Sequence, residues 1–263
     1  MFQTLFLTSS PCAWPPPPGV HAPFLLREEE GFLRELSQRI GPHPNPHLLL
    51  IASTPDAHAQ NDAFVADYRD AFRASGWPAL TADILDSRNT RSMDALLGEA
   101  DIILLCGGHV PTQNRFFQTI GLRESLRQFQ GIIIGISAGS MNAAQTVYAQ
   151  PEEPGESIDP AYQRFLPGLG LTDLHILPHY NENRDTVLDG RRLYAEITLP
   201  DSDGMPLLAI PDGSYVLSEE DHEVLHGEGY LLLNGKMTQI SGPGDQIALT
   251  QAFFMDYLVE KQS

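Results

Sequence analysis

The segment IIIGISAGSMNAA, residues 132–144, places one serine, Ser137, directly after an apolar run and between small residues. This pattern predicts a sharp turn from a buried strand into a helix, which would hold the Ser137 hydroxyl above the edge of a sheet. A nucleophilic serine needs that position. The same pattern is also typical of an ordinary turn in which the serine caps the helix, so the segment alone leaves both interpretations open.

A serine nucleophile needs a base, and His179 is the strongest candidate among nine histidines. The apolar run 174–177 predicts a strand that Pro178 ends. His179 would then lie at the carboxyl end of a strand, the edge at which open α/β sheets bind ligands. His109 also follows a predicted strand and is the main alternative base, while a surface or helix-capping position is the ordinary alternative for His179.

Two backbone amides could stabilise the negative oxygen that forms when a serine attacks a carbonyl. Gly107 and Gly108 follow the strand that we expect to end at Cys106, and glycine lets an N–H approach a substrate without a Cβ in the way. Ala138, directly after the serine, would supply the second N–H. A plain tight turn is the alternative interpretation of the two glycines.

The composition excludes several classes of protein. The 263 residues are 42% hydrophobic and 19% charged, which is typical of a globular chain with a sizeable core. The formal net charge is −18, so the surface repels phosphate backbones and nucleic acid is not an expected partner. Two cysteines make no disulfide framework, and Cys106 in its apolar run predicts a buried thiol. Without a signal peptide or an apolar run of about 18 residues, we expect a cytoplasmic protein that does not enter membranes.

Short apolar runs alternate with longer amphipathic ones, which is typical of βαβ units around a parallel sheet. Residue 131 to residue 136 lacks polar alternation and predicts a central strand buried on both faces. The predicted strands are 3–8, 47–53, 80–85, 101–106, 131–136 and 174–177. The predicted helices are 28–40, 61–75, 92–99, 122–129, 138–149 and 184–197.

The pattern changes after residue 197. Short apolar runs at 207–210, 215–217, 223–225, 230–233 and 237–240 are separated by turn signals, of which Asn234-Gly235 is a strong hairpin signal. They predict antiparallel strands added to the parallel sheet, followed by a helix at 251–260. Two long loops remain, a proline-rich one at 9–23 and an acidic one at 150–168. We therefore expect one α/β domain over residues 1–263, with a doubly wound, mostly parallel sheet and helices on both faces.

Four segments together resemble the dipeptidase E and cyanophycinase family of serine peptidases: CGG at 106–108, GISAGS at 135–140, PHY at 178–180 and IPDGS at 210–214. The resemblance runs from about residue 2 to residue 240. It implies a class I glutamine amidotransferase-like fold and a triad in which Ser137 is the nucleophile and His179 the base. It also implies that the amides of Gly108 and Ala138 form the oxyanion hole.

The acid of the triad is where the sequence departs from that family. The family commonly carries glutamate at this position, whereas the matching residue here is Asp212, which is one methylene shorter. Asp212-Gly213 is also typical of an ordinary turn. Glu153, Glu156 and Asp159 of the acidic loop are alternative acids.

The sequence thus predicts a serine peptidase that hydrolyses dipeptides or short peptides with Ser137, His179 and Asp212. This order differs from that of α/β-hydrolases, and no motif implies a metal or cofactor. A cyanophycinase-like hydrolase of an Asp/Arg polymer and a non-catalytic protein that binds a small ligand are the alternatives. Monomer and homodimer both remain open.

The resemblance to dipeptidase E further implies a preference for an N-terminal aspartate. A cation near Ser137 would then have to bind the substrate carboxylate, and arginine does this with two parallel hydrogen bonds. Arg184, five residues after His179, is the expected ligand. Arg164 and Arg191 are the alternatives.

Overall fold

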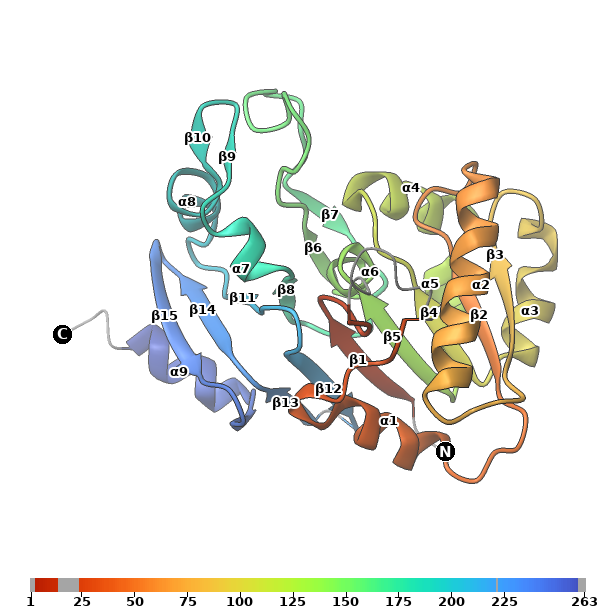
Figure 1. Ribbon diagram of the computed structural model, residues 1–263. Coiled ribbons are helices and arrows are strands. Elements are labelled where there is room, and N and C mark those ends of the chain that lie inside the picture. Colours follow the sequence, from red (N-terminus) through yellow and green to blue (C-terminus); the bar gives the residue numbers. More distant parts are fainter. Residues whose placement is uncertain (1–2, 14–23, 221, 260–263) are drawn as a thin grey trace, which may run out of the picture.

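Five parallel strands form the centre of the main sheet in the computed structural model, which describes residues 3–13, 24–220 and 222–259 (Figure 1). The strand order is β16-β13-β12-β1-β5-β4-β2-β3. The five strands β1, β5, β4, β2 and β3 are parallel to one another, and the other three, β12, β13 and β16, pair antiparallel. The strands are β16 (Gln246–Ala248), β13 (His222–His226), β12 (Tyr215–Glu219), β1 (Thr4–Thr8), β5 (Ile132–Ile136), β4 (Ile102–Leu105), β2 (His47–Ile51) and β3 (Thr81–Leu85).

The predicted parallel strands are confirmed, with ends shifted by no more than two residues. Every residue of β1, β4 and β5 is buried. A strand covered on both faces needs apolar side chains on both faces, which explains the unbroken apolar runs of the sequence. The carboxyl ends of these strands form one edge of the sheet, and the chemistry predicted from the sequence is expected at that edge.

Helices cover both faces of the main sheet, so the predicted doubly wound α/β fold is confirmed. In Figure 1, α1 and α2 lie in front of the sheet, and α3, α4 and α5 lie behind it. The helices are α1 (Phe32–Ile40), α2 (His58–Ala74), α3 (Met93–Glu99), α4 (Val110–Ile120), α5 (Leu122–Leu126), α6 (Ala138–Asn142), α7 (Tyr180–Asn183), α8 (Leu199–Asp201) and α9 (Gln251–Val259). Helix α4 was not predicted from the sequence.

A second sheet holds the strand that precedes His179. Its order is β15-β14-β11-β8, with β8 parallel to β11 and the remaining pairs antiparallel. The strands are β15 (Lys236–Ser241), β14 (Gly229–Leu233), β11 (Leu207–Ala209) and β8 (His175–Leu177). The predicted C-terminal strands are therefore present but divided between two sheets. Asn234-Gly235 forms the predicted hairpin turn between β14 and β15.

The helix predicted at 138–149 is confirmed at its start, Ala138, and wrong after Asn142. Helix α6 ends at Asn142, whose buried side-chain amide donates hydrogen bonds to Gln113 Oε1 (2.9 Å) and to the carbonyl of Val110 (3.2 Å). The chain then forms β6 (Thr146–Tyr148), which pairs with β7 (Phe165–Pro167). The β-branched residues that begin β6 favour a strand over a helix.

The helix predicted at 184–197 is also wrong over most of its length. The chain instead forms a hairpin of β9 (Val187–Leu188) and β10 (Arg191–Arg192), followed by a π-helical segment, Leu193–Thr198. Asp189 and Gly190 form the turn, with φ of 52° and 80°. Asp-Gly is a strong hairpin signal, so the sequence carried the information that decides this element.

Some predictions fall on the margins of the structure. The final helix is confirmed as Gln251–Val259, and residue 260 lies outside the described residues, as does the proline-rich part of the first long loop at 14–23. In the part of the chain that the structure describes, no helix has both the length and the apolar character that a membrane crossing requires.

Candidate active site

Ser137 lies at a strained corner between β5 and α6. Its backbone angles are φ 49° and ψ −113°, a conformation that costs a non-glycine residue on the order of 1–3 kcal/mol. The flanking glycines make the corner possible: a Cβ on Gly139 would lie 2.2 Å from the carbonyl oxygen of Leu105, and one on Gly135 would lie 2.8 Å from the nitrogen of Ser140. The predicted sharp turn is present.

The Ser137 hydroxyl does not cap the helix. It makes no capping hydrogen bond to α6 and no other hydrogen bond to a described residue. The neighbouring Ser140, which is fully buried, instead anchors the corner: its hydroxyl donates to the carbonyl of Thr8 (2.8 Å) and accepts from the Thr8 N–H (2.9 Å). Because Ser140 carries the anchoring role, the hydroxyl of Ser137, a half-buried residue that lines two pockets, is left for a ligand.

His179 and Asp212 form a hydrogen-bonded pair. His179 follows β8 and Pro178 in a left-handed conformation (φ 55°, ψ 39°), and its Nδ1 lies 2.7 Å from Asp212 Oδ1. Ser9, just after β1, joins the two segments: its hydroxyl accepts from the His179 N–H and donates to the carbonyl of Ile210, both at 3.0 Å. The imidazole and the carboxylate are thus oriented by the ends of three strands.

Arg27 is a member of the site that sequence reasoning missed. Its Nη2 lies 3.2 Å from Asp212 Oδ2, and its Nε donates to the carbonyl of Cys12 at 3.1 Å. The Arg27 side chain is only 15% exposed. One oxygen of Asp212 therefore faces His179 and the other faces a guanidinium, which fixes the rotation of the carboxylate.

The two amides expected to form the oxyanion hole are available. Neither the N–H of Gly108 nor that of Ala138 donates a hydrogen bond to any residue within the described ranges. Ala138 begins α6, and Gly108 lines the same pockets as Ser137. Unpaired N–H groups at this position can stabilise an oxyanion.

Two pockets meet at Ser137, and both are also lined by Gly108 and His179. The Tyr68 pocket, about 390 Å³, continues toward Ser9, Tyr68 and Asp212. The Glu152 pocket, about 140 Å³, continues toward Glu152, Asn183 and Leu193. No hydrogen bond joins Ser137 to His179 among the described residues, and such bonds are often long before a substrate binds. The shared lining still brings nucleophile and base candidates to one place.

Cys106 also lines the Tyr68 pocket, but it is a poor nucleophile. Burial raises the pKa of its thiol to about 12. Only the thiolate is strongly nucleophilic. The prediction of a buried thiol is confirmed, and Ser137 is the better candidate for attack.

No described residue of the acidic loop makes a hydrogen bond to the side chain of His179. Glu156 binds His109 (Oε1 to Nε2, 2.7 Å) and accepts the N–H groups of Glu152 and Glu153 at 2.9 and 3.0 Å. Burial alone would raise the pKa of Glu156, but these hydrogen bonds outweigh it and lower the pKa. Asp159 accepts the Ala161 N–H at 2.8 Å. Asp212 is thus the acid that the structure brings to His179, and His109 is engaged elsewhere.

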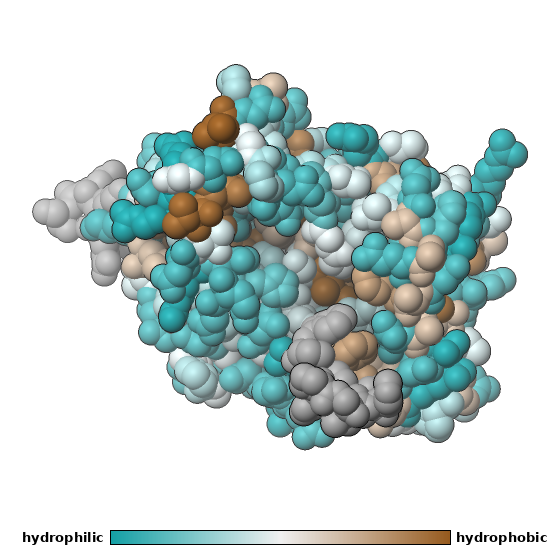
Figure 2. Space-filling view, turned by 45° about the horizontal axis from the view of Figure 1, so that its top comes forward, coloured by the Kyte–Doolittle hydropathy of each residue, from teal (hydrophilic) through white to brown (hydrophobic). Residues whose placement is uncertain are grey.

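The acidic loop lies beside the β9–β10 hairpin at one end of the molecule (Figure 1). Gly155 N–H donates to Asp189 Oδ1 at 2.8 Å, and the Ser157 hydroxyl donates to Oδ2 at 2.7 Å. Figure 2 shows hydrophobic surface at this end, where Ile158 is 65% and Val187 61% exposed. Loop and hairpin together form the outer wall beside the Glu152 pocket.

The structure does not bring Arg184 into either pocket. Its side chain is 53% exposed and lies 3.4 Å from Asp185. Arg164 pairs with Asp201 at 3.3 Å, and Arg191 lies in the exposed strand β10. No lysine or arginine is among the described residues that line the two pockets.

Among the residues that the structure describes, two groups of side chains have the spacing of metal ligands. They are His109 with Glu153 and Glu156, and His179 with Glu182 and Asp212; within each group the ligand atoms lie within 4.8 Å of one another. Both oxygens of Asp212 already have partners in His179 and Arg27. The expectation that no metal is required stays a prediction.

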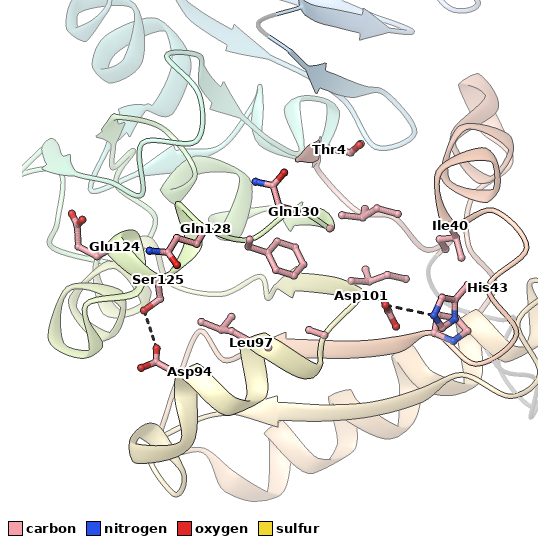
Figure 3. A pocket seen from close by; sticks show the side chains of 17 residues that line it. Thr4, Ile40, His43, Asp94, Leu97, Asp101, Glu124, Ser125, Gln128 and Gln130 are labelled. Atoms are coloured by element: carbon pink, nitrogen blue, oxygen red, sulfur yellow. Dashed lines mark hydrogen bonds and ion pairs between the residues drawn. The ribbon is translucent and has the colours of Figure 1, made fainter. Parts of the chain in front are cut away.

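A further cavity, of about 810 Å³, lies at the opposite edge of the main sheet (Figure 3). Thr4, Ile102 and Ile132, at the amino ends of β1, β4 and β5, line it. In Figure 3, Asp101 faces His43 across 3.7 Å, and Ser125 donates to Asp94. It contains none of the candidate catalytic groups, so its size does not make it the active site.

A serine on a strand-to-helix corner of a mostly parallel sheet, in pockets shared with an imidazole that is paired with a carboxylate, has the features expected of a serine hydrolase. Residues 29–225 match the model of peptidase family S51. The chain belongs to this family and is a serine peptidase, which confirms the resemblance to the dipeptidase E family.

Solved structures share the fold. A peptidase from an acI-B1 actinobacterium is 18% identical with a TM-score of 0.62, over 95% of this chain and 98% of that one. A Listeria monocytogenes EGD-e protein named as a peptidase E is 14% identical with a TM-score of 0.57, over 92% of this chain and 100% of that one. None of the curated protein sequences matches the chain.

Proposed function

We propose that the protein hydrolyses dipeptides or short peptides with Ser137 as nucleophile, His179 as base and Asp212 as the acid that orients the imidazole. The observation that carries this proposal is that Ser137 and His179 line the same two pockets. Asp212 Oδ1 lies 2.7 Å from Nδ1 of the same imidazole. The Glu152 pocket favours a short substrate on its side of Ser137, since it measures about 140 Å³ and sites for drug-sized ligands usually exceed about 300 Å³.

The geometry supports a two-step acyl transfer. Ser137 Oγ attacks the peptide carbonyl while His179 Nε2 accepts the hydroxyl proton, and the amides of Gly108 and Ala138 stabilise the resulting oxyanion. Asp212 keeps the Nδ1 proton of His179 in place, so Nε2 is the free base. His179 then protonates the leaving amine, and a water molecule activated by the same imidazole hydrolyses the acyl-enzyme.

Labelling with a fluorophosphonate probe, combined with mass spectrometry of peptide digests, tests this proposal. We expect the probe to modify Ser137 and the enzyme to cleave dipeptides and tripeptides. Cleavage of an Asp/Arg polymer in preference to dipeptides would favour the cyanophycinase-like alternative. Failure to label Ser137 together with absence of peptide cleavage would contradict the proposal and favour the binding protein.

Arg27 is expected to act as a positioning residue through Asp212. Arg27→Met should lower kcat about tenfold or more with a smaller change in KM, because hydrogen bonds to charged groups contribute about 1.5–3 kcal/mol. Arg27→Lys retains the charge and should recover part of the loss. Steady-state kinetics of both variants, with thermal unfolding as a check on the fold, measures this; equal losses in the two variants would point to a purely structural role.

A further inference from the structure

The Glu152 pocket has an unusual charge balance for the aspartate preference implied by the family resemblance. Among the described residues that line this pocket, Glu152 carries an acidic side chain, and none is a lysine or an arginine. A second carboxylate, that of Glu182, has an oxygen within 4.8 Å of both His179 and Asp212. The sole guanidinium that contacts the catalytic pair in the described chain, that of Arg27, is already paired with Asp212. The surroundings of Ser137 therefore attract cations and repel carboxylates.

The Glu152 carboxylate is held in place with one oxygen left over. Its Oε1 accepts the N–H of Val110, the first residue of α4, at 2.9 Å. None of the residues in the described ranges donates a hydrogen bond to Oε2. Glu152 is an exposed residue that lines the pocket, so a ligand in the pocket can approach its carboxylate.

The backbone around Glu152 is also fixed. Glu156 accepts the N–H groups of Glu152 and Glu153 and binds the imidazole of His109, which directly precedes α4. Glu152 thus lines the same pocket as Ser137 without any rearrangement of the loop. A group that is positioned before binding loses little conformational entropy when it contacts a ligand.

We propose that Glu152 binds a positively charged group of the substrate, either the α-ammonium group of a dipeptide or the side chain of a basic residue. Oε2 would accept a charge-assisted hydrogen bond from the cation while Oε1 keeps its contact with Val110. This inference rests on the proposed function, because it takes the pocket at Ser137 to be the substrate site. If the bound cation is a basic side chain, the preference is opposite to the aspartate preference for which Arg184 was expected.

The test separates charge from structure. Glu152→Gln removes the charge but keeps an oxygen that can accept the Val110 N–H. Glu153→Gln is the matched control, because it removes the same charge from the adjacent residue, which lines neither pocket. Both changes are made in a Ser137→Ala background, so that binding is measured without turnover and stays independent of whether the triad is catalytic.

Titration calorimetry would use four probes, Lys-Ala, Ala-Ala and their N-acetyl forms, with Asp-Ala as a fifth. We expect Glu152→Gln to weaken binding of the cationic probes on the order of 10-fold or more, as for a hydrogen bond to a charged group, and to change N-acetyl-Ala-Ala little. Glu153→Gln should leave the ratio of the affinity for a cationic probe to that for N-acetyl-Ala-Ala within about twofold of its value before the change, the usual range for surface substitutions. Acetylation that removes the difference for Ala-Ala would identify the α-ammonium as the bound cation, and a difference that persists in N-acetyl-Lys-Ala would identify the side chain.

Two results would overturn the inference: equal affinity ratios before and after Glu152→Gln, or no binding of any cationic probe. Tighter binding of Asp-Ala than of Lys-Ala would exclude the basic side chain and leave the α-ammonium group as the bound cation. Failure of the proposed function would be recognised separately, by a wild-type enzyme that binds these peptides but neither cleaves them nor reacts with the fluorophosphonate probe.

Discussion

Ser137→Ala should reduce turnover on the order of 10⁴–10⁶-fold, the range found when a catalytic serine is removed from a triad. The variant loses one hydroxyl oxygen, and that hydroxyl makes no hydrogen bond to any described residue. The free energy of unfolding should therefore change very little. The melting temperature should stay within a few degrees of wild type. Peptide hydrolysis and thermal unfolding of the same preparation measure both quantities, and His179→Ala should show a comparable loss of turnover.

Ser140→Ala is the matched control for Ser137→Ala, because both change a serine in the same motif. Ser140 is fully buried and exchanges two hydrogen bonds with Thr8. Its removal takes the hydroxyl partner from the buried Thr8 N–H, which costs about 1–3 kcal/mol of stability, whereas the Thr8 carbonyl keeps its bond from the Ser137 N–H at 3.0 Å. We therefore expect lower stability with much of the activity retained. A Ser137→Ala variant that kept a substantial share of wild-type activity would exclude this residue as the nucleophile.

The residues that sequence reasoning brought to the site share one property: each follows a short apolar run. Ser137 follows β5, His179 follows β8, and Asp212 follows β11 by three residues. Where such runs form neighbouring strands, their ends converge, so a linear pattern is enough to predict the meeting of distant residues. His179 and Asp212 meet because β8 and β11 are parallel neighbours in the second sheet, whereas Ser137 follows a strand of the main sheet.

The residues that sequence reasoning missed depend on contacts without a local signal. Arg27 reaches Asp212 across 185 positions of the chain. Glu152 is positioned by α4, a helix that the sequence analysis did not predict, and by His109, which it considered only as a base. A side chain at the end of a loop can be placed only when the surfaces that hold the loop are known.

Asp212→Asn should lower turnover by about 10⁴-fold, the effect of the equivalent change in a well-studied triad. The asparagine amide can present an N–H to Nδ1, which favours the tautomer with its proton on Nε2, and that tautomer cannot accept the serine proton. The change also leaves the buried guanidinium of Arg27 with Glu29, at 3.6 Å, as its remaining acidic partner among the described residues. We therefore expect a lower melting temperature as well, and kinetics must be measured well below it.

Three loop variants, Glu153→Gln, Glu156→Gln and Asp159→Asn, provide the comparison that assigns the acid. None of these side chains hydrogen-bonds to His179, since Glu156 binds His109 and Asp159 binds the backbone of Ala161. Their kcat values should remain within about tenfold of wild type, because none of these changes removes the carboxylate that pairs with the imidazole of His179, which transfers the proton. Of the three, Glu156→Gln should have the largest effect, through loosening of the loop that carries Glu152, and that effect should appear in KM. A mild Asp212→Asn variant beside a loop variant with almost no turnover would move the triad acid from the turn after β11 to the acidic loop.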